Sequence, residues 1–126
     1  MSHRPYRTTW FLGALLAVGC STPSVPLPPP GVDVAALSFQ QPAPGQLVLT
    51  GKPSVYHDNA QFYVIDRDNG DGVITTAASD GSFTTGAFTA AVGDTIRVQY
   101  TTGDLTSVPS CVRVVLTGPL VDEGCK

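Results

Sequence analysis

The chain has 126 residues, of which seven are Lys or Arg and ten are Asp or Glu, so its formal net charge is −3. This length fits one domain that is large enough to bury a core. The acidic balance and the lack of a basic run exclude nucleic acid as an expected partner.

The N-terminal segment has the pattern of a secretory signal. Arg4 and Arg7 precede a short apolar run, Trp10 to Val18, which is far below the roughly 20 residues that a membrane-spanning helix needs. Cys20 directly follows the small residues at the end of this run. The sequence Ala17-Val18-Gly19-Cys20 resembles the lipobox of bacterial lipoprotein signal peptides. The resemblance implies that residues 1–19 are a signal peptide and that Cys20 becomes the lipidated first residue.

A lipid on Cys20, such as palmitate, would be a membrane anchor at the bacterial cell envelope. Ser21, where an aspartate would signal otherwise, resembles the context that sorts lipoproteins to the outer membrane of Gram-negative cells. An ordinary cleaved signal, or a short buried helix that contains a cysteine, remains the alternative. Removal of residues 1–19 leaves five basic and ten acidic side chains, which gives a mature charge of about −5.

Residues 20–31 are expected to be the lipidated cysteine and a proline-rich linker. Five prolines stand between Ser21 and Gly31, and proline neither donates a backbone hydrogen bond nor fits a helix interior. At ~3.1 Å per residue in a polyproline conformation, the segment would hold a domain about 30 Å from the lipid. A proline-rich ligand for an aromatic groove is the alternative to this spacer.

Residues 32–126 are predicted to form one all-β domain. Ile96, Val98 and Tyr100 alternate with polar residues, as expected for a half-buried strand. Runs of apolar or β-branched residues recur at short intervals, separated by Gly, Pro, Asn and Asp. The expected strands are 34–39, 47–49, 60–65, 72–76, 82–88, 95–100 and 112–116. About seven strands with this spacing indicate an antiparallel sandwich.

Two turn-centred motifs add a resemblance. Ser79-Asp80-Gly81-Ser82-Phe83-Thr84 places a turn before an inward-facing phenylalanine, and Ala91-Val92-Gly93-Asp94-Thr95-Ile96 places a turn before the alternating strand. Together they resemble the signature of bacterial immunoglobulin-like domains. The resemblance implies a single immunoglobulin-like β-sandwich, in a family whose members serve as spacers and adhesive modules.

Cys111 and Cys125 remain once Cys20 is assigned to the lipid, and an even pair in an oxidising compartment predicts a disulfide. The bridge would tie the C-terminal tail to the last strand, with a stabilisation of roughly 3 kcal/mol. A reactive thiol is the alternative. The sequence has neither a C-x-x-C pair nor the Cys/His spacing of a zinc site.

The segment from Asp66 to Asp71 is a candidate cation loop. Asn69-Gly70-Asp71-Gly72 matches the middle of an EF-hand loop, but Arg67 and Ala78 stand where that loop needs its first and last ligands. The expected structure is a hairpin turn, because Asn-Gly and Asp-Gly between two strands are the strongest short signals for one. A calcium site of another kind that uses Asp66, Asp68 and Asp71 is the alternative; otherwise no cofactor is expected.

The sequence predicts a non-catalytic protein. His57 is the only histidine outside the signal, we expect it to be a solvated loop residue, and no G-x-S-x-G nucleophile motif is present. Tyr56 and His57 are the first candidates for contact with a partner. We therefore expect a lipid-anchored interaction or structural module that binds an unknown envelope protein or glycan, with a calcium- or small-ligand-binding domain as the alternative.

Overall fold

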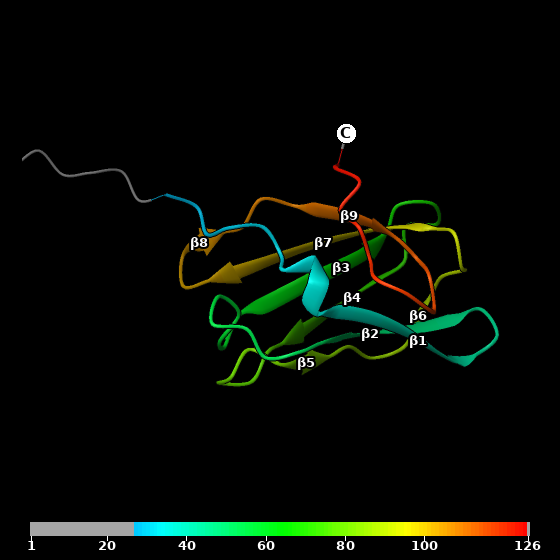
Figure 1. Ribbon diagram of the computed structural model, residues 1–126, viewed down its shortest axis with the longest axis horizontal. Coiled ribbons are helices and arrows are strands. Elements are labelled where there is room, and N and C mark those ends of the chain that lie inside the picture. The colour runs from blue at the N-terminus through cyan, green and yellow to red at the C-terminus, as the bar shows by residue number, and fades with distance from the viewer. Residues whose placement is uncertain (1–26, 126) are drawn as a thin grey trace, which may run out of the picture.

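Two antiparallel β-sheets pack face to face in the computed structural model, which describes residues 27–125 (Figure 1). The chain crosses from one sheet to the other after β2, after β4 and after β6, so each sheet contains strands from two separate segments of the chain. The predicted all-β sandwich is confirmed, and its strand order is that of an immunoglobulin-like fold.

The first sheet is built on β2. Its neighbours are β1 on one side and two short strands, β5 and β6, on the other. A single short 3-10 turn, η1, leads into it. The elements are η1 (Val34–Ala36), β1 (Leu37–Ala43), β2 (Gln46–Gly51), β5 (Phe83–Thr84) and β6 (Phe88–Thr89).

The second sheet is built on β3 and β7, which pair over six residues of each strand. β4 pairs with the other side of β3, while β8 and β9 pair with successive parts of β7. The elements are β3 (Gln61–Asp66), β4 (Gly72–Thr76), β7 (Thr95–Thr102), β8 (Leu105–Thr106) and β9 (Ser110–Arg113).

The nine strands occupy seven main positions plus the two-residue β8, close to the number expected. The predicted strand 82–88 is two pieces, because Thr85 turns inward between them: its backbone N–H and its side-chain hydroxyl are both used in bonds with Leu49. The predicted run 34–39 begins as the 3-10 turn η1 and becomes a strand only at Leu37. The last strand ends at Arg113, before the predicted boundary at residue 116.

The core lies between the sheets and follows the alternation of the strands. Phe62 and Val64 point inward from β3, and Ile96, Val98 and Tyr100 point inward from β7. Phe83, the residue expected to face inward after the Asp80-Gly81 turn, stacks on Phe62 at a centroid distance of 4.0 Å. Burial of these side chains is the main source of stability for the sandwich.

The two ends of the described chain are fixed to the second sheet. The Tyr100 hydroxyl donates a 2.7 Å hydrogen bond to the carbonyl of Pro30. Near the other end, a disulfide joins Cys111 to Cys125, with the two Cα atoms 5.1 Å apart, so the predicted bridge is present. Val112 also pairs with Asp122, which places the tail beside β9.

Candidate functional site

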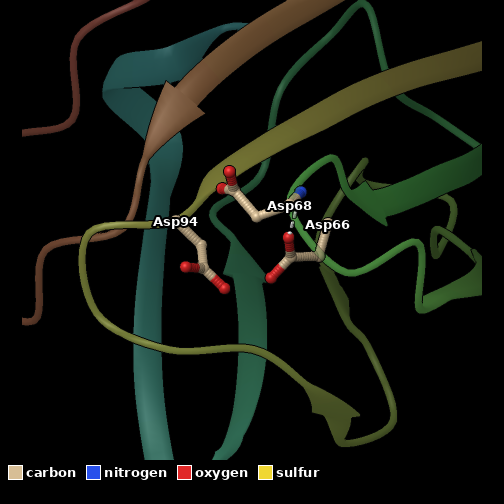
Figure 2. A group of neighbouring side chains, drawn as sticks. All are labelled: Asp66, Asp68 and Asp94. Carbon is tan, nitrogen blue, oxygen red and sulfur yellow. Dashed lines mark hydrogen bonds between the residues drawn. The ribbon is translucent and has the colours of Figure 1, made fainter.

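Three carboxylates meet at one end of the sandwich, although they come from two distant parts of the sequence. Asp66 ends β3, and the register of β3 against β7 places it opposite Ile96. Asp68 follows Asp66 by two residues, and Asp94 precedes Ile96 by two, so the antiparallel register brings these two residues to the same end of the sheet. One carboxylate oxygen from each of Asp66, Asp68 and Asp94 lies within 4.8 Å of the other two (Figure 2). The sheet register therefore assembles the cluster.

Asp66 is the anchor of this cluster. It is 0% exposed, because the alternation of β3 directs it inward like Phe62 and Val64. Its Oδ1 accepts hydrogen bonds from the backbone N–H groups of Asp68 (2.7 Å) and Asn69 (3.2 Å). Its Oδ2 is buried with no hydrogen-bond donor in the described part of the chain. In Figure 2 this second oxygen is directed toward the Asp94 carboxylate.

The other two carboxylates are held by backbone amides. Oδ2 of Asp68 accepts from the N–H of Thr95 (2.8 Å), and Oδ2 of Asp94 accepts from the N–H of Ala91 (3.0 Å). Asp68 is exposed and Asp94 is half-buried, so the cluster is closed on the Asp66 side and open to solvent on the other. Each of these side chains keeps an oxygen that is not used in these bonds.

The electrostatics reflect this crowding of like charges. Burial, followed by the interaction with the Asp94 carboxyl, raises the pKa of Asp66. The same interaction with Asp66 lowers the pKa of Asp94, helped by the Ala91 N–H. Two ionised carboxylates cannot hydrogen-bond to each other, because neither has a proton to donate. Either a proton or a cation must therefore compensate the pair.

The cluster differs from the sequence prediction in one member. Asp66 and Asp68 are brought together as expected, but Asp71 points elsewhere: its Oδ2 accepts the N–H of Thr89 at 2.7 Å, which lowers its pKa. Asp94 takes its place. The sequence pattern places Asp94 in the turn before β7. Only the pairing of β3 with β7 reveals that this turn lies beside the β3–β4 loop.

Tyr56 and His57, the predicted contact residues, lie in the loop between β2 and β3 but face opposite ways. Tyr56 is 58% exposed, whereas His57 is 0% exposed. The expectation that His57 is solvated is wrong, because its ring packs edge-on against Phe62 and Tyr100 at centroid distances of 5.1 and 4.9 Å. The loop can therefore offer Tyr56 and the exposed Val55 to a partner, but not His57.

The outer face of the second sheet carries a further exposed group that sequence alternation implied but did not single out. Tyr63 and Ile74 are cross-strand neighbours on β3 and β4, and both are exposed, as is Ile65. Together with Gly72 and Arg97 they line a shallow hollow. A methyl group on Gly72 would meet the Val64 carbonyl oxygen at 2.5 Å, so this position has to be glycine for β4 to lie so close to β3.

The remaining candidate residues are the three cysteines, of which two lie within the described part of the chain and one lies outside it. Cys111 and Cys125 are the disulfide partners and have a structural role. Cys20, the predicted lipidation site, lies outside the described residues. Within residues 27–125, no helix is both long and apolar enough to cross a membrane.

Comparison with known proteins adds no relative. No protein-family model matches the chain, and no curated protein or solved structure matches it.

Proposed function

We propose that this protein is a lipid-anchored, non-catalytic β-sandwich module that makes contacts at the bacterial cell envelope, and that its contact surface is the outer face of the second sheet. The observation that carries the proposal is the exposed group Tyr63, Ile65 and Ile74 on a strand pair held rigidly by the core. Ile74 is 59% exposed on this face. Binding surfaces are commonly exposed apolar groups carried on a rigid scaffold.

The position of His57 supports the non-catalytic part of the proposal. Both ring nitrogens are buried with no hydrogen-bond partner among the described residues. A general base must reach the proton that it removes, and an imidazole enclosed by Phe62 and Tyr100 reaches only the core.

The anchor rests on the sequence of residues 17–20, which the described residues do not include. Cys20→Ser is expected to shift the protein from the detergent phase to the soluble fraction, or to leave it unprocessed. A variant that still partitions into detergent with the mass of the wild type would contradict the anchor.

The contact surface has its own test. Ile74→Glu places a charge in the middle of the exposed group, while Thr76→Glu places the same charge on the same strand and face, outside the hollow. With the full chain purified in detergent, we expect Ile74→Glu to lose envelope proteins that cross-link to the wild type. Thr76→Glu should retain them, and both variants should keep the melting temperature within a few degrees. Equal cross-linking by the three proteins would reject this face.

A further inference from the structure

The feature that calls for a ligand is the buried Oδ2 of Asp66. A polar atom that is removed from water and left without a partner destabilises the folded state, and a charged group does so more strongly. Asp66 is 0% exposed, and its Oδ2 faces the carboxylate of Asp94 rather than a donor (Figure 2). Its other oxygen is already held by the two amides of the β3–β4 loop. The free oxygen is thus fixed in direction before any ligand arrives.

We propose that Asp66, Asp68 and Asp94 bind a calcium ion between the β3–β4 loop and the segment that precedes β7. Three carboxylates supply only oxygen ligands, which suit a hard cation, whereas zinc favours nitrogen and sulfur. Calcium accepts six to eight oxygens at about 2.4 Å, so two of its ligands can lie up to about 4.8 Å apart. The three carboxylate oxygens all fall within 4.8 Å of one another.

The cluster is prepared for a cation by bonds that leave its charges in place. The amides of Thr95 and Ala91 hold Asp68 and Asp94 through one oxygen each, so the side chains do not need to be ordered when the ion binds. The open side toward Asp68 leaves room for water molecules to complete the coordination shell. Magnesium, which requires near-ideal octahedral geometry and gives up water reluctantly, fits this irregular set less well.

The competing arrangement is a proton shared between Asp66 and Asp94. It satisfies the same buried oxygen without any metal, and it leaves Asp68 with no role in the pair. The two arrangements differ in what calcium does to stability, because only a bound ion adds stability in proportion to its concentration. The cation site does not rest on the proposed contact surface, which lies on the outer face of the sheet rather than at its end.

The test is thermal unfolding of the full chain in detergent, first in EDTA and then with calcium at constant ionic strength. An open site with three carboxylates is expected to have a Kd of roughly 10⁻⁴–10⁻³ M, as in extracellular modules. At about 10 mM CaCl2 the melting temperature should rise by roughly 5–15 °C, and magnesium at the same concentration should give a smaller rise.

The matched variants assign the effect to the cluster. Asp66→Asn keeps an oxygen that can accept from the amides of Asp68 and Asn69, and Asp94→Asn keeps an acceptor for the Ala91 N–H. Both should abolish the calcium-dependent rise. Asp71→Asn, which removes a charge from the same loop outside the cluster, should retain it. If Asp66→Asn does not fold, Asp68→Asn and Asp94→Asn carry the same comparison at less buried positions.

Two results would overturn the proposal. One is a wild-type melting temperature that calcium leaves unchanged; a rise caused by Asp66→Asn in EDTA would then identify a carboxyl pair that only shares a proton. The other is a calcium response that survives Asp94→Asn and is lost in Asp71→Asn, which would place the ion elsewhere in the loop. Neither result depends on whether Ile74→Glu affects cross-linking, so the two proposals fail separately.

Discussion

The hydroxyl of Tyr100 donates a hydrogen bond to the carbonyl of Pro30, seventy positions earlier in the chain. This bond fixes the point at which the proline-rich segment becomes part of the sandwich, because Gly31 already lies against Ser110 and Val32 is buried in the core. The ring of Tyr100 packs beside Phe62 and His57, so the aromatic core and the N-terminal segment share one side chain.

Tyr100→Phe should therefore weaken the attachment of the segment around Pro30 to the sandwich while it keeps the packing of the core. The ring is retained and one hydrogen bond is lost, so we expect a loss of about 1 kcal/mol of stability, with faster proteolytic cleavage ahead of Gly31. Tyr63→Phe is the control: it removes a hydroxyl on an exposed residue that donates to the side chain of Gln61, and it should change stability very little. An equal loss in the two variants would argue against a role for the Pro30 bond.

The buried imidazole predicts an acid sensitivity. Burial lowers the pKa of His57 below its usual value of 6.5, although Asp33 opposes the shift. As the pH falls below 6.5, His57 becomes protonated in the unfolded chain but stays neutral in the folded chain. The free energy of unfolding therefore decreases. Unfolding by denaturant at a series of pH values between about 7.5 and 5 should show this slope.

His57→Leu is the matched control for that slope, since it introduces an apolar side chain of similar size and removes both unpartnered nitrogens. Its stability should be nearly independent of pH over the same interval. It should also fold at least as well as the wild type, because two buried polar atoms are gone. A loss of stability toward acid that persists unchanged in His57→Leu would show that His57 is not its source.

The turn at Gly81 should tolerate no side chain. Its φ is +87°, and a Cβ there would overlap the backbone of Ser54 in the neighbouring loop. Gly81→Ala combines backbone strain with a collision and should cost about 2–4 kcal/mol. Gly103→Ala has a similar positive φ of +59° with open space around it, so it should cost only about 1 kcal/mol. Comparable melting temperatures for the two variants would contradict this explanation.

The disulfide prediction concerns the C-terminal tail. Replacing both Cys111 and Cys125 by alanine should remove roughly 3 kcal/mol of stability and release the tail to proteases. Non-reducing mass spectrometry of the wild type should find the peptide of Cys111 linked to that of Cys125. Two alkylatable thiols in the native protein would contradict the bridge.

Local pattern was sufficient for much of the fold. The alternation of Ile96, Val98 and Tyr100, and of Phe62 and Val64, placed the correct faces of β7 and β3 toward the core. The Asp80-Gly81 turn and the inward Phe83 were also read correctly, because turn chemistry depends on a few adjacent residues. The bridge was predicted from the two cysteines that remained after Cys20 was assigned to the lipid.

What the sequence did not reveal depends on pairing between distant segments. Asp66 shares the alternation of Phe62 and Val64, so its burial was available as a signal, but a carboxylate on an inward face was not expected. Asp94 joins it only through the register of β3 with β7. His57 is buried because its loop folds back over the end of the core, an arrangement that no local pattern encodes.

The tail that the disulfide holds has a consequence for self-association. Val112 pairs with Asp122, and the amide of Glu123 donates to the carbonyl of Cys111, so the chain itself supplies a partner for the outer side of β9. On the opposite side of this sheet, β4 is an uncharged strand with no neighbour beyond it in the sheet of the described residues. Copies that pair through β4 would use up the open side of this sheet in a single pairing, because the tail already covers β9 at its other side. Releasing the tail would expose a second side and allow longer assemblies.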